Sequence, residues 1–200
     1  MRGVGRLRFH APFNELCPAA IDPMIVDVAR KRYAQAYDLM RSYGISVMVA
    51  HTGFVPMVYF EGWFIEKSAE FWVEFLADKP ACFRLHLENM LEGAPDLLCR
   101  IAEAVSDDRF RICLDIGHAA IMSGGLPVIG WVERVLPLLG HVHLHNNHGH
   151  IDTHGAPSDG LIDVAAVIRA VERGAAGVTY TLESRDAGAS VIWMRDNGFI

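Results

Sequence analysis

The sequence predicts an α/β fold in which parallel β-strands alternate with helices. Two observations favour this class. Six short apolar runs are each followed by a turn or a helical pattern, and each run ends on a residue that can bind a metal ion. Strands that alternate with helices form βαβ units with right-handed crossovers, which make the strands parallel. The six predicted strands are residues 7–10, 45–51, 83–88, 111–115, 141–143 and 178–183.

Helical patterns, with apolar residues three and four positions apart, separate the predicted strands. The first covers residues 22–43 and is followed by Gly44, which suits the end of a helix. The aromatic stretch 54–64 contains Pro56 and Gly62, so we expect a loop there. A long polar loop is expected at residues 146–160. The remaining predicted helices are residues 66–76, 95–105, 126–139, 163–173 and 191–197.

The length of 200 residues predicts one domain, residues 1–200, with a substantial core. Six strands are fewer than the eight of a closed (β/α)₈ barrel, which usually needs about 250 residues. Three alternatives follow: an open or incomplete barrel, a fragment of a larger protein, or a sheet completed by a partner chain. A homo-oligomer is compatible with the last alternative.

Composition limits the class of partner. The formal net charge of −6 offers no general attraction for nucleic acid, although bound cations would reverse the sign locally. No apolar run reaches the roughly 18 residues that span a bilayer, so no membrane partner is expected. Three arginines, Arg2, Arg6 and Arg8, are not followed by an apolar segment, so no signal peptide is predicted. The four cysteines are scattered, which is typical of a reduced, cytoplasmic protein.

Candidate metal ligands stand at the ends of the predicted strands. The carboxyl ends of parallel strands open on one face, so donors far apart in sequence would converge there. Two further pairs are expected on loops: Asp115 with His118, where Gly117 allows a tight turn, and Asp152 with His154. Imidazole and carboxylate donors suit Zn²⁺, Mn²⁺, Fe²⁺ or Co²⁺. The strand-end donors are His10, His51, Glu88, Asp115, His143 and Glu183.

Each candidate has a purely structural alternative. A lone His10 or His51 is more often a hydrogen-bonded structural residue than a ligand, and Glu88 could pair with an arginine. A buried carboxylate without a partner is costly, however, which favours a shared cation. We expect His86, His141 and His145 mainly to support the ligands through hydrogen bonds, because ligating histidines commonly need such partners. His148 and His150 are expected to be exposed.

An aromatic cluster follows the second predicted strand and includes Trp63. It either covers a substrate or packs helices. The full cluster is Tyr59, Phe60, Trp63 and Phe64.

At these residues the chain resembles the xylose isomerase-like barrel superfamily, which contains sugar isomerases, sugar epimerases and zinc-dependent apurinic/apyrimidinic endonucleases. The resemblance implies a TIM (β/α) barrel-type fold that is incomplete, with about six βα units and without the first two. The matching segments are HAPF at His10, AHTG at His51, LEN at Glu88, CLDIGHA at Asp115, HVHLHNN at His143, DTH at Asp152 and LES at Glu183.

The resemblance also implies roles for these residues. In the epimerases, the positions of Glu88, Asp115, His143 and Glu183 form one metal site, and the two glutamates serve as acid and base. In the endonucleases a trinuclear zinc site uses more positions. The chain departs from the family at Asn146, where many relatives have Asp, and at Ser158, where Gly is usual. The epimerases' substrate-binding Arg after the HL segment is missing. The endonuclease set corresponds here to His10, His51, Glu88, Asp115, His118, His143, Asp152, His154 and Glu183.

The leading hypothesis is a metal-dependent sugar or sugar-phosphate isomerase/epimerase-like enzyme with Glu88 and Glu183 as catalytic residues. It would bind one to three divalent ions (Zn²⁺ or Mn²⁺) and a small-molecule sugar or sugar phosphate. His118, Trp63 and His145 are the candidate substrate contacts. The first alternative is a zinc-dependent apurinic/apyrimidinic endonuclease-like phosphodiesterase, which the acidic charge disfavours. The second is a truncated, non-catalytic metal-binding barrel.

Overall fold

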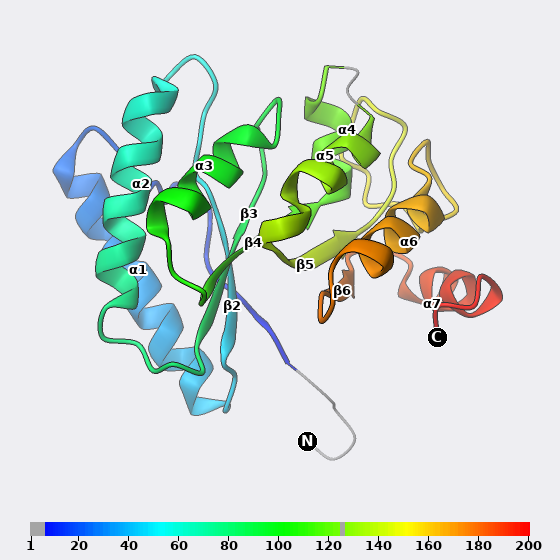
Figure 1. Ribbon diagram of the computed structural model, residues 1–200, viewed down its shortest axis with the longest axis horizontal. Coiled ribbons are helices and arrows are strands. Elements are labelled where there is room, and N and C mark those ends of the chain that lie inside the picture. The colour runs from blue at the N-terminus through cyan, green and yellow to red at the C-terminus, as the bar shows by residue number, and fades with distance from the viewer. Residues whose placement is uncertain (1–6, 125–126) are drawn as a thin grey trace. The chain divides into compact units, whose positions relative to one another are not determined.

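The computed structural model describes residues 7–124 and 127–200, in which six strands alternate with helices along the chain (Figure 1). The alternation agrees with the sequence prediction. Arg2, Arg6 and the predicted helix start at residue 126 lie outside the described residues. The chain divides into two compact units. Unit 1 is Met1–Glu88 with Leu97–Arg111, and unit 2 is Asn89–Asp96 with Ile112–Ile200.

Three parallel strands bring the first donors of unit 1 into register. These are β1 (Phe9–His10), β2 (Val47–His51) and β3 (Arg84–Glu88). The last residue of β2, His51, pairs directly with the last residue of β3, Glu88. Because the strands are parallel, both side chains leave the sheet at the same edge.

Helices α1 (Pro23–Ser42) and α2 (Glu61–Leu76) lie side by side in unit 1 (Figure 1). The Asp22 side chain caps α1 by accepting a hydrogen bond from the Met24 N–H (2.8 Å). The buried face of α1 packs on α2, and the rings of Tyr33 and Trp72 lie 5.0 Å apart between centroids. The third helix, α3 (Asp96–Val105), buries six apolar side chains, among them Leu98 and Ile101.

Unit 2 repeats this arrangement with β4 (Phe110–Asp115), β5 (Leu139–Leu144) and β6 (Thr179–Leu182). Only the last four residues of β4 belong to unit 2. All three strands are parallel, and Asp115 at the end of β4 is in register with His143 of β5.

The helices of unit 2 are α4 (Ile116–Met122), α5 (Val128–Val135), α6 (Val164–Gly174) and α7 (Ala187–Asp196). A short 3₁₀ turn, η1 (Leu136–Leu138), follows α5. Helices α5 and α6 lie next to each other (Figure 1). Pro137 lies within η1, where it supplies no backbone N–H to continue the α-helix.

Several boundaries differ from the sequence prediction. The Asp115–His118 pair, expected on a loop, belongs to helix α4: Asp115 is its N-cap and accepts a hydrogen bond from the His118 N–H (2.7 Å). The expected loop at 54–64 already becomes helical at Glu61, so Trp63 stands in α2. The last helix, predicted from residue 191, begins at Ala187 because Asp186 caps it by accepting from the Ala189 N–H.

Two further expectations concern cysteines and membranes. All four cysteines lie in the described part of the chain, and none forms a disulfide. Within residues 7–124 and 127–200, no helix combines the length and apolar character needed to cross a membrane.

Candidate metal-binding site

Unit 1 brings His10, His51 and Glu88 together at the ends of its three strands. The Nε2 atoms of His10 and His51 lie 3.1 and 3.5 Å from Oε2 of Glu88. Glu88 is 1% exposed, so its carboxylate is almost wholly removed from water. A Phe13 ring stacks on His51 with 4.4 Å between centroids. The side chains of His10, His51 and Glu88 could hold one metal ion.

The tautomer of His10 follows from its hydrogen bonds. Its Nδ1 lies 2.8 Å from the carbonyl oxygen of Ala11, and a carbonyl can only accept. Nδ1 therefore carries a proton, and in the neutral ring the lone pair of Nε2 faces Glu88, 3.1 Å from its Oε2. A neutral imidazole whose second nitrogen donates to a backbone carbonyl is the usual form of a metal-ligating histidine.

In unit 2, Asp115, His143 and Glu183 form a second group at the strand ends. The Nδ1 atom of His143 lies 3.3 Å from Oε1 of Glu183 and 3.9 Å from Oδ2 of Asp115. Glu183 follows β6 and is positioned by its backbone N–H, which donates to the Leu144 carbonyl (3.0 Å). Asp115 is 0% exposed, whereas 26% of the Glu183 side chain is exposed. A small molecule can therefore reach Glu183 but not Asp115.

Asn89 positions Asp115, a role that the sequence analysis did not identify. Its side-chain carbonyl accepts from the Asp115 N–H (2.8 Å), and its amide donates to the Asp115 carbonyl (2.9 Å). This pair of hydrogen bonds fixes the backbone at the carboxyl end of β4. The LEN motif contained the signal, because a buried amide directly after a strand end needs partners of this kind.

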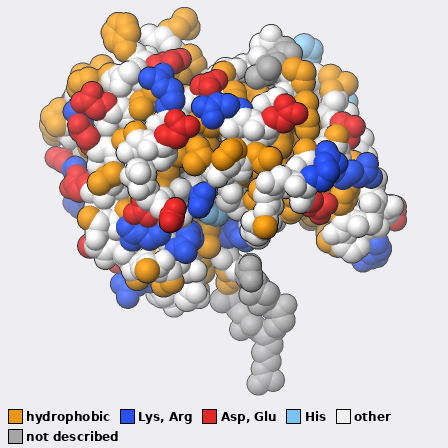
Figure 2. Space-filling view, in the orientation of Figure 1, with side chains coloured by type: hydrophobic (Ala, Val, Ile, Leu, Met, Phe, Trp, Pro, Cys, Tyr) orange, Lys and Arg blue, Asp and Glu red, His pale blue; other side chains and the backbone are white. Residues whose placement is uncertain are grey.

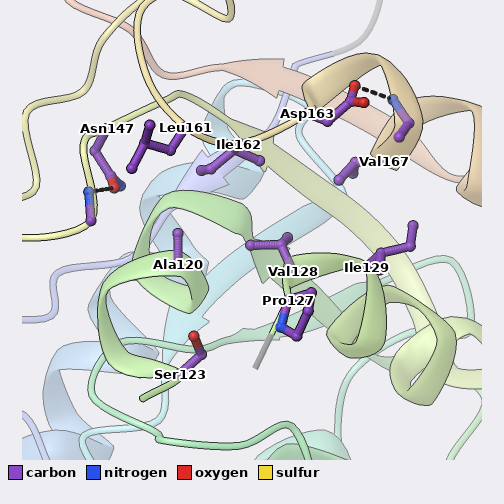
Figure 3. A pocket seen from close by; sticks show the side chains of 12 residues that line it. Ala120, Ser123, Pro127, Val128, Ile129, Asn147, Leu161, Ile162, Asp163 and Val167 are labelled. Carbon is purple, nitrogen blue, oxygen red and sulfur yellow. Dashed lines mark hydrogen bonds between the residues drawn. The ribbon is translucent and has the colours of Figure 1, made fainter. Parts of the chain in front are cut away.

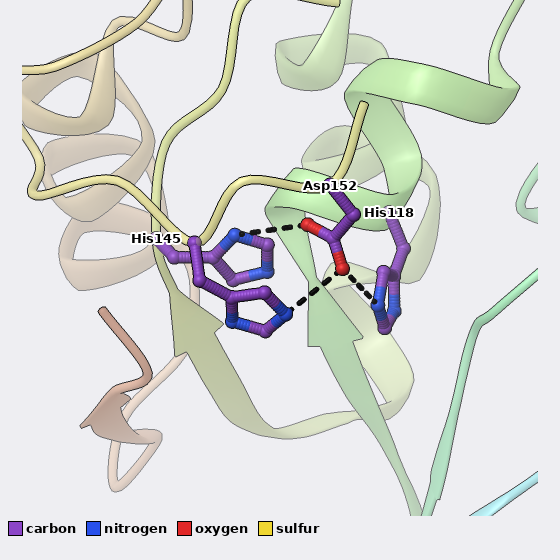
Figure 4. A group of neighbouring side chains, drawn as sticks. His118, His145 and Asp152 are labelled. Carbon is purple, nitrogen blue, oxygen red and sulfur yellow. Dashed lines mark ion pairs between the residues drawn. The ribbon is translucent and has the colours of Figure 1, made fainter. Parts of the chain in front are cut away.

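A third group, also in unit 2, contains His118, His145, Asp152 and His154, whose ligand atoms lie within 4.8 Å of one another. The Asp152 carboxylate lies between the rings of His118 and His145 (Figure 4). Its Oδ2 is 3.2 Å from Nε2 of His118 and 2.8 Å from Nε2 of His154. Its Oδ1 is 3.5 Å from Nδ1 of His145.

The backbone near Asp152 departs from an extended conformation at His154. His154 has a φ of 48°, in the left-handed region. The turn nevertheless brings the Asp152 and His154 side chains together, and the His154 ring stacks on His145 with 4.0 Å between centroids. The exposed positions expected for His148 and His150 are confirmed.

Some side chains of the aromatic cluster are buried, and others remain exposed at the surface. Phe64 is fully buried and contacts Phe54 and Tyr59, with ring centroids 5.0 and 5.2 Å apart. Burial raises the pKa of the Tyr59 phenol to about 12. Trp63 stays 41% exposed, and its Nε1–H donates to the carbonyl of Ala19 (3.4 Å). Its remaining exposed ring surface keeps the predicted role as a substrate contact open.

An apolar cavity of about 500 Å³ lies elsewhere in unit 2, next to α4, α5 and α6 (Figure 3). Two of its polar side chains are engaged: Asp163 caps α6 by accepting from the Ala166 N–H, and Asn147 accepts from the Gly149 N–H. Among the described residues that line the cavity, none belongs to the predicted site.

The donor set fits divalent metal ions. Tetrahedral Zn²⁺ with ligands at about 2.0–2.1 Å places neighbouring donors roughly 3.3 Å apart, and the donor separations of 2.8–3.5 Å around Asp152 bracket that value. In the same group, the buried atoms His145 Nδ1 and Asp152 Oδ1 have no hydrogen-bond partner among the described residues. Buried polar atoms of this kind are costly unless a cation or water satisfies them.

The chain belongs to the family described as the xylose isomerase-like TIM barrel, whose model matches residues 5–197. Its fold is therefore of the TIM (β/α) barrel type, as the sequence predicted. Among curated proteins, it is 25% identical over 174 residues to Uncharacterized protein MJ1311 of Methanocaldococcus jannaschii. The match covers 80% of this chain and 57% of that relative, so the chain spans a little over half the length of the relative.

Several solved structures have a similar fold. A D-tagatose 3-epimerase-like protein superposes with a TM-score of 0.82 at 23% identity, covering 98% of this chain and 78% of the other. The TTHB071 protein from Thermus thermophilus, soaked with ZnCl₂, gives 0.79 at 25% identity, with 99% and 80% covered. The IOLI protein with a bound zinc atom gives 0.74 at 17% identity, with 96% and 74% covered.

Proposed function

We propose that the chain is a metal-dependent sugar or sugar-phosphate isomerase/epimerase-like enzyme. The observation that carries the proposal is the Asp115–His143–Glu183 group. It joins a fully buried carboxylate, an imidazole and a partly exposed carboxylate at the ends of three parallel strands. The carboxyl-terminal face of the strands is where enzymes with this fold carry their active sites. Structural relatives named as sugar epimerases support the same class.

In this proposal Glu183 moves the proton at the carbon next to the carbonyl, and Asp115 and His143 are ligands of the metal beside it. The resemblance assigns Glu88 as the second acid–base residue. Glu183 is exposed enough to meet a C–H bond next to a carbonyl. Its position is held by the Leu144 carbonyl and by contact with His143. A bound Zn²⁺ or Mn²⁺ would polarise the substrate carbonyl and the adjacent hydroxyl. Positioned acid–base groups typically contribute about 10²–10⁴-fold in rate.

The test is wash-in of solvent deuterium into a panel of ketoses and ketose phosphates, with the metal-loaded protein. We expect exchange at the carbon next to the carbonyl. Glu183→Gln should lower that exchange by at least about 100-fold. Glu133→Gln is the matched control, because it removes the same charge from an exposed site on α5. Absence of exchange with every sugar, despite bound metal, would refute the proposal.

A second candidate is phosphodiester hydrolysis at abasic DNA. The observation that favours it is the third donor group, because His118, Asp152 and His154 add a metal-binding cluster beyond Asp115, His143 and Glu183. Two-metal sites activate water and stabilise the leaving oxygen in such reactions.

Surface charge weighs against the second candidate. Acidic and basic side chains are interspersed on the face shown in Figure 2, and the net charge is −6. DNA-binding proteins instead gather Lys and Arg along the phosphate backbone. Incision of a duplex with one abasic site decides between the two candidates: cleavage by zinc-loaded protein supports the hydrolase, and intact duplex eliminates it.

A further inference from the structure

We propose that His145 is a metal ligand, which completes a closed site of three imidazoles and one carboxylate with His118, Asp152 and His154. The sequence predicts only a supporting role for His145, and the resemblance implies only the other three residues as ligands. The inference deepens the proposed function, because it rests on the chain being a divalent-metal protein. It also assigns the ligand: a tetrahedral ion, with Zn²⁺ as the best match for nitrogen and oxygen donors.

Hydrogen bonds set the tautomers of two of the three imidazoles. Nδ1 of His118 lies 3.0 Å from the carbonyl oxygen of Asn89, and Nδ1 of His154 lies 2.8 Å from that of Glu183. Because a carbonyl oxygen only accepts, both Nδ1 atoms carry protons. In the neutral rings, the Nε2 lone pairs of both histidines then point at Asp152.

His145 shows the same pattern with its nitrogens exchanged. Its Nε2 lies 2.9 and 3.0 Å from the two carboxylate oxygens of Asp115, which accept its proton when Asp115 is ionised. In the neutral ring, Nδ1 is left with a lone pair directed at Oδ1 of Asp152, 3.5 Å away. A carboxylate that orients a ligating histidine through its second nitrogen is a common outer partner at zinc sites.

The pair formed by His145 and Asp152 is costly without a cation. The His145 side chain is fully buried, and neither its Nδ1 nor Oδ1 of Asp152 has a hydrogen-bond partner among the described residues. Two acceptors that face each other in a low-dielectric site repel. One added proton would give a hydrogen-bond partner to only one of the three imidazole nitrogens that face Asp152. A metal ion at the centre would bind all three nitrogens and the carboxylate.

The backbone also makes room for this ring. A Cβ atom on Gly117 would lie 1.9 Å from Cε1 and 2.4 Å from Nδ1 of His145. Only glycine at the first turn of α4 allows the imidazole to reach Asp152 in this position. The close approach therefore supports a defined placement for the ring.

Four protein donors leave no open coordination position on a tetrahedral ion, and this is the pattern of structural rather than catalytic zinc. The inferred ion would hold the 146–160 loop to α4. It would also be linked through His145 to Asp115, which contacts His143 in the neighbouring group.

The test begins with metal-free protein titrated with Co²⁺ and then with Zn²⁺ in competition. The wild-type chain should show the intense visible absorption of four-coordinate Co²⁺. His145→Asn should lose the part of that absorption that belongs to this site, and one Zn²⁺ should bind at least about tenfold more weakly than in the wild type. His150→Asn, an exposed imidazole in the same loop, should match the wild type. Unchanged absorption and affinity in His145→Asn would overturn the inference.

A crystal structure of zinc-loaded wild-type protein tests the same point without relying on a folded variant. A Zn–Nδ1 distance to His145 of about 2.0–2.1 Å is expected. A distance beyond about 3 Å would overturn the inference. The deuterium-exchange assay tests the proposed function separately from this inference. If the wild-type protein holds zinc on His145 but exchanges no deuterium into any sugar, the isomerase proposal is refuted and the closed site is not.

Discussion

Replacing Gly117 by alanine tests whether the buried position of His145 is as constrained as the structure indicates. The added methyl would lie 1.9 Å from the imidazole, and an ordinary carbon–carbon contact needs about 3.5–4.0 Å. The ring would have to move away from α4 by roughly 1.5–2 Å to restore an ordinary contact. That shift breaks the hydrogen bonds between His145 and Asp115.

The expected magnitude combines three effects. Overpacking in a closed interior costs about 1–3 kcal/mol. Loss of a hydrogen bond to an ionised group costs about 1.5–3 kcal/mol. Replacing a glycine in a helix by alanine raises the free energy of unfolding by about 0.5–1 kcal/mol. We therefore expect Gly117→Ala to lower the free energy of unfolding by about 1.5–5.5 kcal/mol.

Urea unfolding of metal-free protein, followed by tryptophan fluorescence, measures this change. Gly62→Ala is the matched control. Gly62 is also the second residue of a helix, and a Cβ there would meet nothing within 4 Å. We expect the control to be neutral or more stable by up to about 1 kcal/mol. If Gly117→Ala behaves like Gly62→Ala, the inferred packing of His145 is wrong.

Three further outcomes are expected. Asp115→Ala should lower the metal content of purified protein, measured by elemental analysis; unchanged stoichiometry would contradict its assignment as a ligand. Arg109 lowers the pKa of Asp107, so this pair stabilises the protein above the unfolded aspartate pKa of about 3.9 and less as the pH falls through the lower folded value. Asp107→Asn should therefore destabilise the protein at pH 7 and only slightly at pH 2, and equal losses at both would refute this. Leu85→Ala, at a fully buried position of β3, should cost about 2–5 kcal/mol in urea unfolding, and a loss below about 1 kcal/mol would contradict its core position.

The strand ends could be predicted because parallel strands have a regular geometry. Each apolar run ended on a donor, and parallel pairing alone then brings neighbouring ends to one edge. The observed register of His51 with Glu88 and of Asp115 with His143 agrees with that expectation. No knowledge of side-chain contacts was needed for it.

Helix α4 was missed because it is short. Seven residues carry too little periodicity to separate a helix from a turn, and Gly117 suggested the turn. Asp115 also has two functions at once, since it is both a strand-end carboxylate and the N-cap of α4. A sequence pattern does not distinguish these functions when one residue performs both.

The order of the elements and the chemical type of each donor could be predicted, because both follow from local patterns of apolar and ligating residues. The folded chain was needed to show which nitrogen of each imidazole faces a carboxylate, and which histidines share Asp152. These features depend on hydrogen-bond partners far away in the chain. His118 finds its acceptor at Asn89, and His154 finds its acceptor at Glu183.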